Sequence, residues 1–345
     1  MITRALKAIA EPVLLIGASL LIVEIACRVW VHFFYFIPAP STELLTEPDA
    51  ALGWRNKPGQ YLLYPYRQDA TLAPEPYGIT INSDGSRGAP GGGRQVVDYF
   101  FGCSFTHGFA VDDSQTIPAL FEKKSEAGAL NFGVPGYGTL QALQLMKNIL
   151  PQSLPPETVV FYLYLDSHDD RTVVEPYWMS WLFHPYSMRP LIGSVPYCDW
   201  GAAGVRCFPP TEYPHVPFRD WLMISRVIGD VIYTVGSRQR VSHKREISRV
   251  LMSQMNDLVK SRGGRLVVIF LLSDDAVLKS HADFLRAQGI DYLDCRDERF
   301  EQASMRQGDN LHPNGTMNEI YADCLSRAQT SMAAQPQSGG GSPKL

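Results

Sequence analysis

The chain has 345 residues, of which 45% are hydrophobic and 19% charged, and its formal net charge is -4. This length and composition are those of a globular protein with a sizeable buried core. A chain without excess basic charge lacks the footprint of a nucleic-acid-binding protein, so we expect no nucleic-acid partner. The six cysteines form no CxxC pair, which argues against a zinc site, and we expect no metal and no cofactor.

The segment 1–40 is expected to be a membrane anchor. Two basic residues precede an uncharged apolar run, Val13–Val23, and an aromatic run closes the segment. One helix through this segment is long enough to cross a bilayer whose apolar core is about 30 Å thick. Glu24 and Arg28 stand four residues apart, so they can pair on one helix face and ease the cost of a charge inside the membrane.

A cleaved signal peptide is the alternative for this segment, although no small-residue cleavage site fits well after the apolar run. Basic residues ahead of the run favour an N-terminus inside the cell. We therefore expect a single-pass protein of the inner (cytoplasmic) membrane, whose main domain faces the periplasm or the cell exterior.

The remaining chain divides by composition. Residues 41–95 are expected to form a linker and a small β region, residues 96–332 one large domain, and residues 333–345 a disordered tail. The expected strands of the large domain lie within residues 94–102, 128–139, 157–166, 265–272 and 290–295. The expected helices lie within residues 114–126, 140–150, 244–264, 280–289 and 314–332. This alternation predicts an α/β fold with a parallel sheet covered on both faces, whose ligands bind at the carboxyl ends of the strands.

An aromatic-rich insertion, residues 171–242, interrupts the alternation. Its tryptophans are Trp178, Trp181, Trp200 and Trp221. Two interpretations stay open, since these side chains can stack on sugar rings or can form a small core of the insertion itself. Cys198 and Cys207 bracket a short Gly/Ala loop and are either a local disulfide, as an extracytoplasmic location would favour, or two free thiols.

In the stretch YFFGCSFTHGF, Tyr99–Phe109, an apolar strand leads directly to Ser104, which has Gly102 and Gly108 on either side. A turn would explain this pattern, and so would a serine held exposed at the end of the sheet. A serine hydroxyl becomes a useful nucleophile only when a positioned base, usually a histidine oriented by a carboxylate, takes its proton.

A candidate base lies in the segment QGDNLHPNG, where Asp309 precedes His312 by three residues. The segment follows the last predicted strand, so we expect it at the carboxyl edge of the sheet, near the serine. The D-x-x-H spacing is common by chance, and an ordinary turn at a helix start would explain the segment equally well.

Taken in order, GCSFTHG, NFGVPGYGT and DNLHPN resemble the sequence blocks of the SGNH/GDSL hydrolase superfamily, over about residues 96–332 without the insertion. Members of this superfamily are esterases and acyltransferases with a flavodoxin-like three-layer α/β/α sandwich. The resemblance implies that Ser104 is the nucleophile, His312 the general base and Asp309 its orienting partner. It also implies that the backbone N–H groups of Ser104 and Gly136 form an oxyanion hole.

Two blocks depart from the pattern of the superfamily. Cys103 replaces the usual aspartate before the nucleophile, a position that supports the loop. The third block usually supplies an asparagine as a further oxyanion donor, and here the strand is followed by DSHDDR. His168 is our favoured replacement and Ser167 the other, whereas ionised Asp166 cannot donate. The alternative for His168 is a structural histidine bonded to a neighbouring carboxylate.

A further segment, NSDGSRG at residues 82–88, is similar to anchored members of the superfamily from bacterial envelope and exopolysaccharide systems. Its Arg87 is expected to be a surface turn residue rather than part of an ion pair near the site.

Together these features predict a membrane-tethered serine acyl-ester hydrolase or O-acetyltransferase that acts on an acylated carbohydrate of the cell envelope. Transfer would make an acyl-donor protein a partner. Two alternatives are a non-catalytic carbohydrate-binding or assembly protein that retains the fold, and a lipid esterase.

Overall fold

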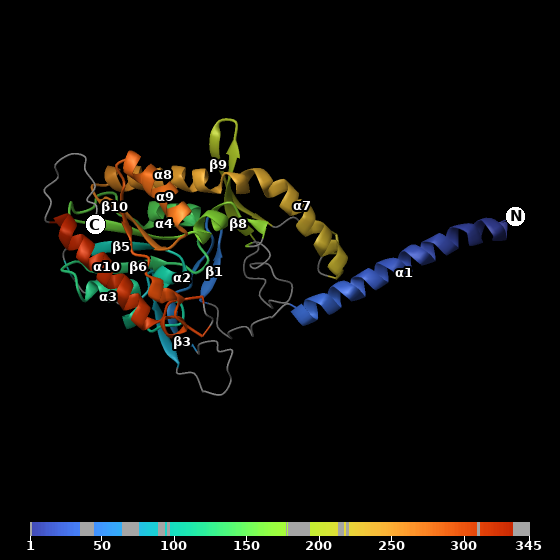
Figure 1. Ribbon diagram of the computed structural model, residues 1–345, viewed down its shortest axis with the longest axis horizontal. Helices are drawn as coiled ribbons and strands as arrows, with labels where there is room; N and C mark the ends of the chain where they lie inside the picture. The colour runs from blue at the N-terminus through green and yellow to red at the C-terminus, as the bar shows by residue number, and fades with distance from the viewer. Residues whose placement is uncertain are drawn as a thin grey trace.

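The computed structural model describes residues 2–34, 45–63, 76–88, 94, 97–176, 178, 194–212, 217–218, 221–308 and 311–333. Its centre is a five-stranded sheet in the spatial order β11-β10-β7-β5-β6 (Figure 1). The strands are β5 (Val97–Gly102), β6 (Gly128–Gly133), β7 (Val159–Leu165), β10 (Arg265–Leu272) and β11 (Asp291–Asp294). All four pairings between neighbouring strands are parallel, which confirms the predicted parallel sheet.

Helices cover both faces of this sheet, so the expected three-layer α/β/α sandwich is confirmed. The helices are α3 (Ile117–Glu122), α4 (Thr139–Ile149), α8 (Lys244–Ser261), α9 (Asp275–Ala287) and α10 (Gly315–Ala333). Apolar residues of α4, α8 and α9 belong to one buried cluster, and those of α3 and α10 belong to a second cluster.

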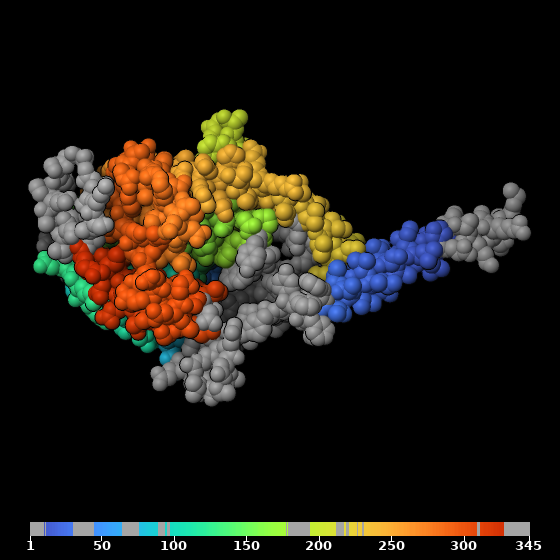
Figure 2. Space-filling model, in the orientation of Figure 1, coloured from blue at the N-terminus to red at the C-terminus, as the bar shows by residue number. Residues whose placement is uncertain are grey.

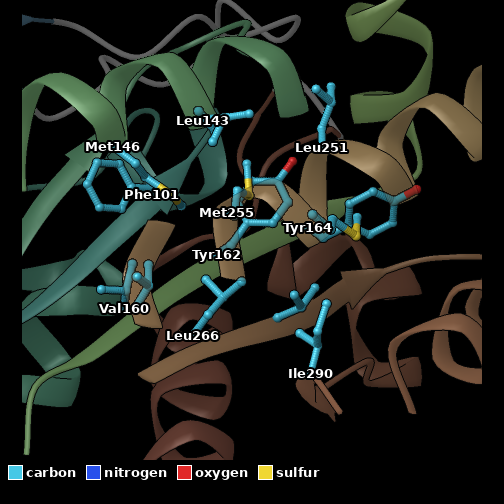
Figure 3. Packing of buried hydrophobic residues seen from close by; sticks show 14 of the residues in the cluster. Phe101, Leu143, Met146, Val160, Tyr162, Tyr164, Leu251, Met255, Leu266 and Ile290 are labelled. Carbon is cyan, nitrogen blue, oxygen red and sulfur yellow. The ribbon is translucent and has the colours of Figure 1, made fainter. Parts of the chain in front are cut away.

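The side chains of the strands divide between these two clusters by their alternation. In β7, Tyr162 and Tyr164 join the first cluster, whereas Phe161 and Leu163 join the second. Successive residues of a strand point to opposite faces, so a strand covered on both sides must be apolar throughout. Figure 3 shows the first cluster, with Tyr162 and Tyr164 packed near Leu251 and Met255.

The strand order places a ligand crevice in this sheet. Counted along the chain, the five strands lie in the order 2-1-3-4-5, which is that of flavodoxin-like folds. The connection from β5 to β6 and the connection from β7 to β10 leave towards opposite sides. Folds of this topology bind their ligands at the switch point between two such strands, which here is at the carboxyl ends of β5 and β7.

The aromatic-rich insertion contains an antiparallel hairpin and a long helix. The hairpin consists of β8 (Ser194–Gly201) and β9 (Gly204–Glu212), and the helix is α7 (Met223–Ser242). The hairpin carries the Cys198–Cys207 disulfide, the first of the two alternatives left open by the sequence. Trp200 stacks on His243 with ring centroids 5.2 Å apart and packs against the first cluster, so this tryptophan attaches the insertion to the main domain. Trp181 lies outside the described residues.

A second disulfide, which the sequence did not indicate, joins Cys295 to Cys324. Cys295 follows β11 and Cys324 lies on α10, so the bond fixes the last helix to the edge of the sheet. Two shorter antiparallel pairs precede the sheet in the chain. They are β1 (Thr46–Asp49) with β2 (Gly53–Asn56), and β3 (Gly59–Leu63) with β4 (Tyr77–Ile81).

The N-terminal helix α1 (Ile2–Phe34) extends away from the domain that contains the five-stranded sheet (Figures 1 and 2). Its window Pro12–Val29 is long and apolar enough to cross a membrane, and only 6% of that window is buried. A signal sequence has the same length and composition, so this helix is either an anchor or a signal.

Candidate active site

Two glycines shape the exit of the chain from β5 to Ser104. A Cβ at Gly102 would lie 2.2 Å from Thr106 Oγ1 and 2.8 Å from the Leu163 carbonyl, so only glycine fits there. The single turn α2 (Ser104–His107) then ends at Gly108, whose φ of 89° favours glycine. The serine therefore stands at the carboxyl end of the sheet, as the sequence predicts.

A third glycine lets α2 lie against the neighbouring strand. A Cβ at Gly133, the last residue of β6, would come within 2.2 Å of the His107 backbone nitrogen. The sequence alone gave no reason to single out this residue.

His312 lies within hydrogen-bond distance of the predicted nucleophile. Its Nε2 is 2.8 Å from Ser104 Oγ, although the two residues are 208 positions apart in the chain. The imidazole stacks on Phe109, with ring centroids 4.2 Å apart. The structure thus brings together two of the three residues expected to form the catalytic group.

The backbone around His312 is held on both sides. The Gln307 N–H donates to the His312 carbonyl, and the Asn314 N–H donates to the Met305 carbonyl. The Asn314 side chain also accepts a hydrogen bond from the Met317 N–H and thereby caps the start of α10. This explains the HPNG sequence, because the asparagine starts the helix and fixes the loop that carries the histidine.

Asp309 lies outside the described residues. Its role as the orienting partner of His312 therefore stays a prediction.

Arg87 is not the surface residue that the sequence led us to expect; it is 3% exposed. Its guanidinium donates to the carbonyl oxygens of His107, Gly108 and Val111 and forms an ion pair with Asp113. Burial lowers the pKa of Arg87, and the carboxylate of Asp113 opposes that shift. The arginine follows β4, so a segment from outside the sheet holds the loop that follows Ser104.

Gly136 lies in the loop between β6 and α4, with a φ of 86°. The Val134 N–H donates to the Gly102 carbonyl at 3.1 Å, which joins this loop to the end of β5. A Cβ at Gly136 would lie 3.1 Å from the Trp54 ring and 3.5 Å from the Trp178 ring. The predicted oxyanion glycine is therefore flanked by two tryptophans, and its role as a donor stays a prediction.

The side chain of His168 lies where a substrate has little access to it. Its side chain is completely buried, and its Nδ1 lies 2.8 Å from the Tyr162 hydroxyl. Burial lowers the pKa of His168 well below its ordinary value, which keeps the ring neutral. This placement favours the alternative of a structural histidine, although the partner is Tyr162 rather than a carboxylate. The nearby Asp169 instead contacts His281 at 3.2 Å.

Asp166, at the end of β7, links two strand ends. Its carboxylate accepts hydrogen bonds from the Ser273 hydroxyl and the Asp274 N–H, both of which follow β10. Burial raises the pKa of Asp166. Ser167, the other donor that the sequence left open, begins α5 (Ser167–Thr172) and is only partly buried.

In the part of the chain that the structure describes, no three His, Cys, Asp or Glu side chains come together as a metal site would require. The groups that do come together at the sheet edge are the Ser104 hydroxyl and the His312 imidazole. This pair can supply a nucleophile and the base that activates it.

The fold and the Ser104–His312 pair define a doubly wound α/β protein with a serine–histidine pair at the carboxyl edge of its sheet. No family model and no curated protein matches the chain. In fold it is similar to SGNH/GDSL hydrolases among the solved structures. A lipolytic protein of the G-D-S-L family from Desulfitobacterium hafniense is 12% identical, with a TM-score of 0.40, over 68% of this chain and 99% of that one.

Two other structures are similar at the same level. The esterase EstA from Pseudoalteromonas sp. is 9% identical, with a TM-score of 0.42, over 69% of this chain and 99% of that one. A carbohydrate esterase family 2 enzyme from Corynascus thermopiles is 15% identical, with a TM-score of 0.38, over 72% of this chain and 69% of that one. These likenesses concern the fold, and the chemistry is inferred from the site itself.

Proposed function

We propose that this chain is a membrane-tethered serine esterase or O-acyltransferase that acts on an O-acylated carbohydrate of the cell envelope. The observation that carries the proposal is the 2.8 Å contact between Ser104 Oγ and His312 Nε2. A base within hydrogen-bond reach of a hydroxyl, in the ligand crevice of a parallel sheet, is what nucleophilic catalysis requires.

In the first half of the reaction, Ser104 Oγ attacks the ester carbonyl carbon while His312 Nε2 accepts the hydroxyl proton. The tetrahedral intermediate collapses, the bond to the carbohydrate oxygen breaks, and His312 returns the proton to that oxygen. An acyl-serine remains. In the second half, His312 takes a proton from the acceptor, which attacks the acyl-serine, and Ser104 is regenerated with its proton.

Negative charge develops on the carbonyl oxygen in both halves. We assign its stabilisation to the backbone N–H groups of Ser104 and Gly136. As the first residue of α2, Ser104 has an N–H without a partner inside that helix. Each such donor contributes about 3 kcal/mol to the stability of the transition state. Ser167 is the candidate for a third donor.

A carbohydrate substrate is supported by an aromatic ring beside Gly136. Trp54 and Trp178 flank this glycine, and the Arg171 guanidinium lies 4.6 Å from the centre of the Trp178 ring. Trp54 is 1% exposed and belongs to a buried cluster, so the ring that can meet a sugar is that of Trp178, which is only partly buried. A partly exposed aromatic ring next to an oxyanion donor suits a sugar whose ester group points at Ser104.

A location outside the cytoplasm is supported by both disulfides, since such bonds persist in oxidising compartments. With α1 as an anchor in the inner membrane, the catalytic domain would face the periplasm or the cell exterior. Water as acceptor gives hydrolysis. A sugar hydroxyl as acceptor gives transfer, which requires an acyl donor such as a partner protein.

The test is turnover of acetylated xylan, peptidoglycan and an exopolysaccharide by the full-length protein, with and without an added acyl donor. We expect release or transfer of acetate by the wild type and a loss of about 10⁶-fold in Ser104→Ala. Preference for long-chain over acetyl p-nitrophenyl esters would instead support a lipid esterase. Equal turnover by the wild type and Ser104→Ala would contradict the proposal.

A further inference from the structure

We infer that the first half of α7 and the turn before it insert into the lipid bilayer beside α1. The chain then contacts the membrane through α1 and through Phe218 with the stretch 221–232, which we call the membrane hook. This inference rests on the proposed role of α1 as an anchor. It adds a second lipid-binding surface, which belongs to the insertion of the catalytic domain.

The hook exposes a continuous apolar stripe. The exposed side chains on α7 are Val227, Ile228, Val231, Ile232 and Val235. Their spacing of three, four and eight residues puts them on one side of the helix. Just before α7, Phe218 and Trp221 are 70% and 78% exposed. Such a surface is costly in water and favourable among acyl chains.

Other large apolar side chains that are exposed on the described surface outside α1 lie singly or at the start of α7. They are Leu62, Leu222, Leu272 and Leu311. Scattered residues of this kind are normal, whereas a stripe on one helix marks an interaction surface.

The occupant of this surface is identified by its continuity with α1. The Glu24 carboxylate of α1 accepts hydrogen bonds from the Met223 and Ile224 N–H groups, each at 3.0 Å. Arg28 donates to Glu24 at 2.6 Å and to the Trp221 carbonyl, also at 2.6 Å. The start of α7 is therefore attached directly to the apolar helix, and Figures 1 and 2 show the two helices meeting there.

The position of Glu24 fixes the depth of this contact. Glu24 lies five residues before Val29, the end of the membrane-spanning window Pro12–Val29. With a rise of 1.5 Å per residue, the start of α7 would lie about 8 Å inside that window. Free N–H groups at a helix start are unfavourable in lipid unless they are bonded, and the Glu24 carboxylate satisfies two of them. The joint thus explains a glutamate within an apolar helix.

The other end of α7 is attached to the catalytic domain. The Arg240 guanidinium donates to the Val173 carbonyl at 2.7 Å, and the Tyr233 hydroxyl donates to the Val174 carbonyl at 2.6 Å. Both carbonyls directly follow α5, the helix after β7. One helix therefore connects the lipid to the carboxyl edge of the sheet, and it sets the orientation of the catalytic domain relative to the membrane surface.

The inference is tested by lipid photocrosslinking of the full-length protein in phosphatidylcholine/phosphatidylglycerol nanodiscs. A benzophenone amino acid replaces, one at a time, Ile228, Ile232, Ile16 on α1 and Leu62 on β3. Leu62 is the matched control because it is 62% exposed, compared with 58% for Ile232, and lies on the catalytic domain. We expect lipid adducts at positions 16, 228 and 232, at least ten times more abundant than at position 62.

Each other outcome overturns the inference in a distinguishable way. Adducts at position 16 without adducts at 228 and 232 leave the anchor in place and remove the hook. Absence of lipid adducts at position 16 removes the anchor and the inference that rests on it. The same variants in native membranes would assign the stripe to a protein partner if positions 228 and 232 crosslink to protein instead of lipid. Turnover by Ser104 is measured separately, so its loss or retention bears only on the proposed function.

Discussion

Two long-range contacts of this molecule differ in how readily they can be predicted from the sequence. At the sheet edge, Ser104 meets His312 across 208 positions, and at the membrane joint Glu24 meets Met223 across 199 positions. Local sequence patterns indicate the first contact, because the carboxyl ends of the strands of a parallel sheet lie at one edge. The second depends on the docking of two helices, for which the chain carries no periodic signal. Chemistry at a sheet edge can therefore be inferred from sequence more readily than the joints between its appended parts.

The largest expected effect is at the sheet edge and concerns the base. We expect His312→Ala to lower kcat for ester turnover by about 10⁶-fold, since the Ser104 hydroxyl loses its proton acceptor. Asp309→Asn should lower kcat less. His243→Ala, at the end of α7, is the matched control and should keep turnover within about twofold. Steady-state kinetics on p-nitrophenyl acetate provide the measurement, and full activity of His312→Ala would remove the proposed base.

A smaller effect is expected from Arg87, which holds the nucleophile loop without touching substrate. Arg87→Ala leaves three buried carbonyl groups without their donor, so we expect a loss of about 3 kcal/mol in the free energy of unfolding. The kcat should fall by about 10-fold to 100-fold while KM changes little, because the loop positions Ser104.

Arg55→Ala is the control for this prediction, because Arg55 forms an exposed ion pair with Glu47 that contributes at most about 1 kcal/mol. Denaturant unfolding and steady-state kinetics test both variants. Equal behaviour of the two would contradict the positioning role of Arg87.

The smallest predicted effect concerns the buried histidines His107 and His168. Burial lowers the pKa of each well below its ordinary value of 6.5, so both stay neutral in the folded state while the unfolded chain takes up protons. Their stabilisation is complete above pH 6.5 and is lost as the pH falls below that value. Each contributes a slope of about 1.4 kcal/mol per pH unit.

This prediction is measured by denaturant unfolding between pH 6.5 and 5. The difference in slope between the wild type and His168→Gln should be about 1.4 kcal/mol per pH unit. An identical slope in the two proteins would show that His168 titrates normally, and would reopen its role as an exposed donor near the site.

The sheet, its alternation with helices, and the placement of Ser104 at the sheet edge could all be predicted from the sequence. These predictions were possible because apolar runs, and glycines at the end of a strand, are recognisable within a short stretch of sequence. The prediction for Arg87 was wrong because its partners follow Ser104 in the chain, and only the folded antiparallel pair β3–β4 brings the arginine to them. The burial of His168 against Tyr162 could not be predicted from the sequence either, since a polar residue after a strand usually faces the ligand site at the sheet edge.

The Cys295–Cys324 disulfide could not be predicted for a related reason. Its two cysteines lie on a strand end and on a helix, and 29 positions separate them. A spacing of this length carries no geometric signal until the helix is docked on the sheet. The hairpin pair, nine positions apart, was at least a recognisable alternative.

The central claim is that Ser104 is activated by His312, and labelling with a serine-reactive fluorophosphonate tests it most directly. We expect the probe to modify the wild type at Ser104, to leave Ser104→Ala unmodified, and to react far more slowly with His312→Ala. Labelling of Ser104→Ala at the wild-type rate, or no labelling of the folded wild type, would contradict the account.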